Sequence, residues 1–256
     1  MVNTSLIISW VLEGEYFVLI RNLINILLVY VLSTFIAYAN GGVWLDATRI
    51  IYNQSDNAKS IKVNNSSSEI PYLIRAWVTE VNSSESDKKW VVTPPIYRLN
   101  EESAIQLKLA LLDKLSLPAD RESLFYLNTL SIPGEPKDVT KMENDTLEGK
   151  ITIAINSKIK IFYRPDSLLD VEMSKEYKKL EFSAKNKNIT IKNPTAFHMN
   201  FLELKVDGVN YSIDRHMVAP FSTVTFSTKS EPKKLDFRLI NDFGGKTALE
   251  SVRFKG

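Results

Sequence analysis

Residues 151–165 read ITIAINSKIKIFYRP, and the rest of the chain is organised around them. Isoleucine occupies alternate positions, with Ser157 as the only break: Ile151, Ile153, Ile155, Ile159 and Ile161. Successive side chains of a strand point to opposite faces, so these isoleucines would share one face. About fifteen extended residues exceed the usual strand of roughly 5–6. We therefore predict a long strand whose apolar edge favours pairing with another chain.

Composition bounds the class of protein before any motif is considered. The chain has 256 residues, 44% of them hydrophobic and 24% charged, which is typical of one or two folded domains with real cores. Its 32 basic and 30 acidic residues are mixed along the sequence, so no polycationic surface for nucleic acid is expected. There is no cysteine, which excludes a disulfide framework and thiol catalysis.

The N-terminal region has the pattern of an export signal. Arg21 precedes an apolar run at residues 26–36, and Ala37-Tyr38-Ala39 is the small-x-small pattern that signal peptidases cut. We predict that residues 1–39 are a signal peptide cleaved after Ala39. The alternative is a membrane anchor, because residues 23–39 are uncharged and just long enough to span. The first twenty residues are atypical of a signal, and a later translation start would explain them.

After the signal, short extended runs alternate with turn formers. Strands are predicted at residues 43–52, 60–63, 71–78, 105–111 and 123–128, and a second set between residues 180 and 254. The tandem prolines Pro94 and Pro95 favour one cis bond. Strands at this spacing, with little helical periodicity, indicate an all-β chain of two antiparallel sandwiches. We predict an N-terminal domain at residues 40–165 and a C-terminal domain at residues 166–256.

Five separated motifs then carry a family resemblance. Residues 117–128 read LPADRESLFYLN and close at Ile132-Pro133, and the other four are KIKIFYRP at 158–165, TPP at 93–95, NPT at 193–195 and INDFGG at 240–245. In their order along the chain, these motifs resemble those of the periplasmic pilus chaperones of the chaperone–usher pathway, the PapD-like family, over essentially all of the mature sequence. Thr129 departs from the family pattern, which usually has an aliphatic residue there.

The resemblance implies a fold and an activity. Members of this family have two immunoglobulin-like domains arranged as a boomerang, and they bind pilin or fimbrial subunits in the periplasm. Each subunit is a sandwich that lacks its last strand, and the chaperone lends its own strand by donor-strand complementation. The subunit then passes to an outer-membrane usher. No nucleotide motif is present, so no cofactor is expected.

The resemblance also assigns a binding site. Arg49 and Lys160 match the family's cleft pair, which holds the C-terminal carboxylate of the subunit, a chemistry suited to two cations. Ile151, Ile153 and Ile155 would enter the subunit's groove. Without the resemblance, Arg49 and Lys160 would be interpreted as ordinary solvated surface cations. A second copy of the chain is a further candidate partner, because it would cap the apolar edge until a subunit arrives.

A second assignment from the family is structural. Glu122, Arg164 and Asp242 match a network of ionic residues between the two domains, and breaking such a network leaves an unpaired charge. The alternative is three unconnected surface charges. The link at residues 133–150 is longer than in short-loop family members, yet it lacks the cysteine pair of the long-loop class. We assign the chain to the short-loop class with an expanded connection.

Other functional classes have less support in the sequence. The two histidines, His198 and His216, are interpreted as ordinary strand or loop residues, because no Gly-x-Ser-x-Gly elbow and no paired-histidine metal spacing is present. We expect neither catalysis nor a metal site. The stronger rival is an exported two-domain adhesin or carbohydrate-binding module, which would present its site on loops.

Overall fold

The computed structural model describes residues 21–28, 41–135 and 152–254. The chain divides into two units, residues 1–40 and 41–256. In the first unit, residues 21–28 are helical. Within the described ranges, no helix is both long and apolar enough to cross a membrane. The predicted cleavage site after Ala39, most of the link at 133–150 and Ile151 lie outside the described residues.

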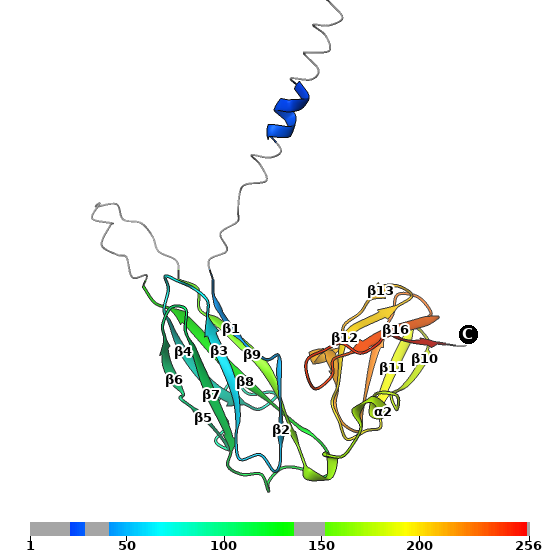
Figure 1. The fold of residues 1–256 in the computed structure, drawn as a ribbon. Helices are drawn as coiled ribbons and strands as arrows, with labels where there is room; N and C mark the ends of the chain where they lie inside the picture. The colour runs from blue at the N-terminus through cyan, green and yellow to red at the C-terminus, as the bar shows by residue number, and fades with distance from the viewer. Residues whose placement is uncertain (1–20, 29–40, 136–151, 255–256) are drawn as a thin grey trace, which may run out of the picture. The chain divides into compact units, whose positions relative to one another are not determined.

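The first sandwich consists of two sheets (Figure 1). One has the order β1-β3-β7-β5, and its strands are β1 (Val43–Leu45), β3 (Lys59–Asn65), β7 (Ala104–Leu111) and β5 (Trp90–Thr93). The other has the order β2-β9-β8-β4-β6, and its strands are β2 (Arg49–Asn53), β9 (Ile155–Arg164), β8 (Ser123–Pro133), β4 (Tyr72–Thr79) and β6 (Ile96–Leu99). Every pairing is antiparallel except β2 with β9, which is parallel.

The predicted strand at residues 43–52 is two strands in the structure. β1 pairs with β3 in one sheet, and β2 pairs with β9 in the other. The crossing lies at Asp46, whose side chain accepts a hydrogen bond from the Lys62 backbone N–H at 3.0 Å. The local pattern of apolar residues does not predict that the chain changes sheets at this point. β5 and β6 were not predicted either, and the bond between Thr93 and Pro94, at the end of β5, is cis.

The long strand is shorter than predicted. β9 begins at Ile155, and residues 152–154 precede it without strand pairing. Its first pair is Ile155 with Ser131 on β8, and the remaining residues of β8 pair only with β4. β8 itself runs five residues beyond the predicted end, because β4 and β9 flank it on both sides and satisfy its backbone groups.

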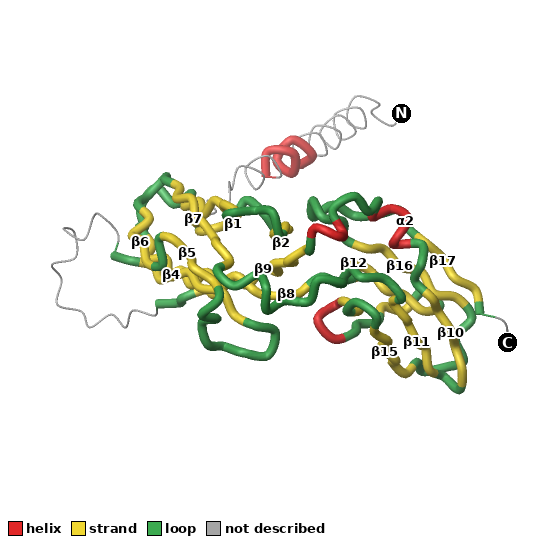
Figure 2. The backbone as a smooth tube through the Cα atoms, turned by 90° about the horizontal axis from the view of Figure 1, so that it is seen from below, coloured by secondary structure: helices red, strands yellow, loops and turns green. Residues whose placement is uncertain are grey.

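The second sandwich also has two sheets. One has the order β10-β11-β15, and its strands are β10 (Glu181–Lys185), β11 (Asn188–Asn193) and β15 (Ser222–Ser227). The other has the order β13-β12-β16-β17, with β14 also paired to β12, and its strands are β13 (Val209–Asn210), β12 (Met199–Val206), β16 (Lys234–Leu239), β17 (Glu250–Arg253) and β14 (Met217–Val218). Helical segments are short: η2 (Asp166–Leu168), α2 (Met173–Tyr177) and η3 (Asp214–His216), and strands dominate in Figure 2.

Each sandwich has its own hydrophobic core. In the first, Tyr52, Trp90 and Phe125 form a chain of edge-to-face ring contacts with centroids 5.0 and 5.4 Å apart. In the second, the buried cluster includes Phe201 and Phe237. A small third cluster joins Phe162 of β9 to Met217 of β14, one residue from each sandwich. The prediction of an all-β chain with two sandwiches is confirmed.

Candidate functional site

The two edges of β9 are covered differently along its length. On one edge, β8 pairs with β9 from residue 155 to residue 163. On the other edge, β2 covers only residues 160–164. Residues 155–159 therefore have one edge without a strand partner among the described residues. A free edge presents backbone N–H and C=O groups that another strand can pair with.

The isoleucine row passes from solvent into the core of the first sandwich. Ile153 is 70% exposed and Ile155 is 63% exposed. Ile159 is partly buried and packs against the first core, and Ile161 is completely buried at 0%. The alternating face predicted from the sequence is thus real, but its two ends differ. The apolar side chains at 153 and 155 project to solvent beside the free edge.

Arg49 and Lys160 are direct neighbours in the parallel pairing of β2 with β9. Lys160 Nζ donates to Asn200 Oδ1 at 2.8 Å and to the backbone carbonyl of Arg215 at 2.9 Å. Arg49 Nη1 donates to the carbonyl of Ile240 at 3.3 Å, and its buried Nε has no hydrogen-bond partner in the described part of the chain. The two predicted anchor residues are therefore together, and these acceptors are all neutral oxygens.

Burial dominates the electrostatics of this pair. It lowers the pKa of Lys160 from 10.5 to about 8, and the positive charges of Arg49 and Arg215 act in the same direction. Burial also lowers the pKa of Arg49, although Asp242 acts against this shift. Desolvation disfavours the charged form of a base, and a nearby anion would favour it. An additional anion at this pair would therefore favour the charged forms of Arg49 and Lys160.

A cavity of about 330 Å³ lies beside Arg49, between the turn before β2 and the loop that contains Asp242. Gly244 in that loop has φ +80°, and a Cβ there would lie 2.6 Å from Thr48 Oγ1. Only glycine fits both the conformation and the close approach. The INDFGG motif thus brings the second sandwich directly against the start of β2.

The predicted ionic network is formed. Arg164 donates from Nε and Nη2 to Glu122 Oε1 at 3.0 and 2.8 Å. It also donates from Nη1 and Nη2 to the two carboxylate oxygens of Asp242 at 2.8 and 3.1 Å. Arg164 is 8% exposed and Glu122 is 5% exposed. Burial alone would lower the pKa of Arg164, but the hydrogen bonds and charges of Asp242 and Glu122 outweigh it and raise the pKa.

Three contributors to these contacts were missed by sequence reasoning. His198 donates its backbone N–H to Glu122 Oε2 at 2.8 Å, and its Nδ1 lies 3.2 Å from the same oxygen. Asn200 and Arg215 supply the two acceptors of Lys160. All three belong to the second sandwich, whose residues meet β9 only through the tertiary fold. No local signal in the sequence identifies them.

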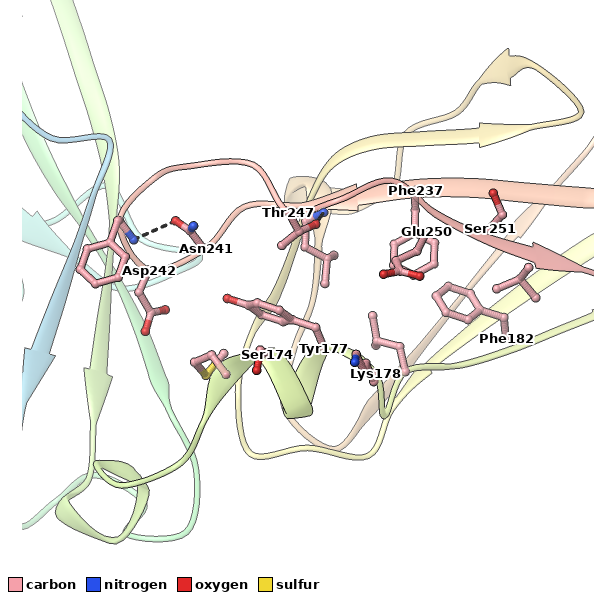
Figure 3. Close-up of a pocket in the computed structure, with 15 residues that line it drawn as sticks. Ser174, Tyr177, Lys178, Phe182, Phe237, Asn241, Asp242, Thr247, Glu250 and Ser251 are labelled. Carbon is pink, nitrogen blue, oxygen red and sulfur yellow. Dashed lines mark hydrogen bonds between the residues drawn. The ribbon is translucent and has the colours of Figure 1, made fainter.

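A larger cavity of about 600 Å³ lies in the second sandwich, and Figure 3 shows its lining. Tyr177 lines it, with its hydroxyl turned to the side on which Asp242 lies. That hydroxyl is buried and has no hydrogen-bond partner among the described residues. Burial, reinforced by Asp242, raises the pKa of Tyr177 to about 12. Of the predicted site residues, only Asp242 lines this cavity. Within the described ranges, no cluster of three or more potential ligands would hold a metal.

Comparisons with known proteins identify the family of the chain. Residues 42–169 match the family model described as the pili and flagellar-assembly chaperone, PapD N-terminal domain. Residues 175–251 match the model of the pili assembly chaperone PapD, C-terminal domain. The two sandwiches therefore define a pilus-assembly chaperone of two domains. The chain belongs to the PapD family of pilus-assembly chaperones.

Individual relatives cover most of the chain. The uncharacterized fimbrial chaperone YbgP of Escherichia coli strain K12 is 34% identical over 75% of this chain and 78% of its own length. The periplasmic chaperone SfaE is 29% identical, with a TM-score of 0.65 over 83% of this chain and 98% of that one. A chain from the complex of the Salmonella enterica SafA pilin with the SafB chaperone is 25% identical, with a TM-score of 0.71 over 85% and 98%.

Proposed function

We propose that this protein is a periplasmic chaperone that binds a pilin subunit by donor-strand complementation, caps it and delivers it to an outer-membrane usher. Membership of the PapD family supports this proposal. So does the structure in which the SafB chaperone is bound to the SafA pilin. The rival interpretation as an adhesin or carbohydrate-binding module is not favoured by these relatives.

The observation that carries the proposal is the free edge of β9 at residues 155–159. This edge stops where β2 begins, at Arg49 opposite Lys160. A subunit strand that lies along the edge and ends at these cations must place its C-terminus at the Lys160 end. It therefore runs in the same direction as β9. Because a shift of one residue would turn every side chain to the other face, the anchored carboxylate would fix the register.

The two parts of the site contribute differently to binding. Full burial of one isoleucine stabilises a complex by roughly 1.5–3 kcal/mol, so Ile151, Ile153 and Ile155 together supply the larger share. Each charge-assisted hydrogen bond from Arg49 or Lys160 to a carboxylate adds roughly 1.5–3 kcal/mol. We infer that the isoleucines supply affinity and that the cations supply alignment.

The ionic network of Glu122, Arg164 and Asp242 would have a structural role. Arg164 closes the C-terminal end of β9, and Asp242 lies in the loop that meets β2. Loss of one partner would leave a buried charge unpaired. The network would therefore fix the position of the second sandwich relative to the free edge of β9.

The periplasmic location would follow from export. We propose that the signal at residues 1–39 is cleaved after Ala39, which leaves a mature chain from Asn40 to Gly256. The relative SfaE is a periplasmic chaperone, in agreement with this location. When no subunit is bound, a second copy of the chain would be able to cover the free edge.

Co-expression with a pilin subunit tests the proposal. The mature protein is purified by an affinity tag, and the amount of subunit that remains bound is measured for the wild type, Arg49→Ala and Lys160→Ala. We expect both variants to retain at most about a tenth of the subunit, from the strength of the lost hydrogen bonds. Lys192→Ala, on β11 in the second sandwich, is the matched control. Full capture by both cleft variants would overturn the anchor.

A further inference from the structure

The loop that contains η3 meets the first sandwich at Lys160. The carbonyl of Arg215 accepts a hydrogen bond from Lys160 Nζ at 2.9 Å. The guanidinium of the same residue donates from Nη2 to Asn82 Oδ1 at 2.7 Å. Asn82 lies in the connection between β4 and β5 of the first sandwich. Arg215 thus joins the two sandwiches through both its backbone and its side chain.

The backbone of this loop has an uncommon conformation. Arg215 has φ 52° and ψ 13°, and His216 has φ 53°. Residues with a Cβ rarely occupy this left-handed region, and two in succession need external contacts to hold them. The Arg215 side chain supplies such a contact through Asn82. Its Nη1 also pairs with Oδ2 of the neighbouring Asp214 at 2.7 Å. The conformation directs the Arg215 carbonyl at the ammonium of Lys160.

Arg215 also contributes positive charge to the cleft. Charged and titratable groups reach Lys160 from several elements. Arg49 lies opposite it on β2, Tyr126 is its partner on β8, and Arg215 approaches from the second sandwich. Both arginines disfavour the ammonium form of Lys160. The nearest acidic group of the loop, Asp214, is already paired with Arg215. Arg215 is therefore a second arginine beside Lys160: its backbone carbonyl contacts the ammonium, and its guanidinium is held by Asn82 and Asp214.

We propose that Arg215 is a third cationic residue of the anchor, which positions Lys160 through its backbone carbonyl and adds charge that selects a free terminal carboxylate. This inference rests on the proposed function, because it names a further residue of the same site. The chemistry it selects is an extended apolar segment that ends in a carboxylate. The same segment with a neutral amide end would gain nothing from the third cation.

The experiment compares two forms of one peptide. A designed peptide of about twelve residues, with alternating valine and threonine, is long enough to follow the free edge of β9. It is prepared as the free acid and as the C-terminal amide, and its Kd is measured by fluorescence anisotropy. The ratio of the two Kd values reports carboxylate selection and cancels contributions that both forms share.

A matched pair of variants separates charge from structure. Arg215→Gln removes the charge but retains a polar side chain, whereas Arg215→Lys retains the charge. We expect Arg215→Gln to reduce carboxylate selection about three- to tenfold, as for one unit charge about 4 Å away with water-like screening, because Arg215 is exposed. Arg215→Lys should restore most of it. Lys192→Gln, a cation of the second sandwich on β11, should leave the ratio unchanged.

The outcomes distinguish this inference from the proposed function. If the wild type binds acid and amide equally, the carboxylate anchor itself is wrong, and the third cation with it. If the wild type prefers the acid and Arg215→Gln prefers it equally, only the role of Arg215 is overturned.

A second measurement remains available if Arg215→Gln folds poorly. The pKa of Lys160 is followed by NMR of labelled lysine in the wild type and in Asn82→Ala, which releases the guanidinium from its contact. We expect the pKa of Lys160 to rise in Asn82→Ala, because the released charge moves away. An unchanged pKa in a folded variant would contradict the inference.

Discussion

The isoleucine row runs through both halves of β9, but the two halves are covered differently. Residues 160–163 lie between β2 and β8, and Ile161 is completely buried. Residues 155–159 have only β8 beside them, and Ile155 is 63% exposed. One half completes the protein's own sandwich, and the other half is available to complete another. The difference in pairing follows from where β2 begins, at Arg49 opposite Lys160.

The largest effect is expected at the buried end of β9. Glu122→Ala would leave the Arg164 guanidinium and the His198 backbone N–H without a shared acceptor inside the protein. Removal of one partner from a buried ion pair costs about 3–5 kcal/mol, so the free energy of unfolding should fall by that amount. Urea denaturation measures it. A loss below about 1 kcal/mol, typical of exposed ion pairs, would show that the network is solvated.

A pair of isoleucine variants compares the two halves directly. Ile161→Ala removes a buried side chain and should lower the free energy of unfolding by about 2–5 kcal/mol. Ile155→Ala should change it by no more than about 0.5 kcal/mol, because its side chain is exposed. Subunit capture per folded molecule should fall more in Ile155→Ala than in Ile161→Ala. Equal losses of stability in the two variants would contradict the assignment of Ile161 to the core and of Ile155 to the exposed half of β9.

Ile153→Asp sharpens this comparison at the exposed end. The side chain is 70% exposed, so the variant should fold with nearly unchanged stability. A carboxylate carried into an apolar groove would cost several kcal/mol, so subunit capture should be lost. Thermal unfolding and co-purification measure the two properties on the same sample. Loss of folding would place this side chain in the protein's own interior.

Lys160 lies where the covered and exposed halves of β9 meet, and we expect it to help binding without adding to stability. Burial lowers the pKa of Lys160 to about 8, so the charged form is disfavoured in the free protein. Lys160→Met should therefore leave the free energy of unfolding at pH 7 unchanged or increased. Carboxylate binding should weaken about ten- to a hundredfold, from the loss of one charge-assisted hydrogen bond. A clear loss of stability would mean that Lys160 has a structural role.

The smallest effect concerns pH. A bound carboxylate raises the pKa of Lys160 above its free value of about 8. Affinity should therefore be fully present below about pH 7 and fall as the pH rises through 8, because the free lysine must then take up a proton. Lys160→Arg should remove this dependence, since arginine stays charged. A flat wild-type profile between pH 7 and 9 would contradict the assigned protonation of Lys160.

The sequence predicted the fold class, and period-two isoleucines predicted a long strand. Family resemblance was needed for every charged residue of the site, since isolated charges carry no signal of their own: Arg49, Lys160, Glu122, Arg164 and Asp242. Arg49 does lie opposite Lys160, and Glu122 does contact Arg164. The roles of these residues in subunit binding stay predictions.

The failures have a common physical cause. The division of residues 43–52 into β1 and β2 depends on which strands lie nearby, and alternation is the same in either sheet. β9 begins at Ile155 although β8 continues for two residues beyond Ser131, the partner of Ile155. His198, Asn200 and Arg215 act only because the second sandwich reaches β9. Local patterns predict strands, but tertiary contacts determine where each strand is covered.

Cysteine cross-linking measures the direction and register of a strand bound to β9, and the chain contains no cysteine of its own that would interfere. Asn156→Cys and Lys158→Cys each place one thiol on the exposed half of β9. The designed peptide is prepared as a free acid with a cysteine at each position in turn, and disulfide yield is measured. We expect that moving the protein cysteine from position 158 to position 156 shifts the peptide position of highest disulfide yield by two residues, away from the peptide C-terminus. A shift toward the C-terminus, or uniform yields, would contradict a parallel strand anchored at Arg49 and Lys160.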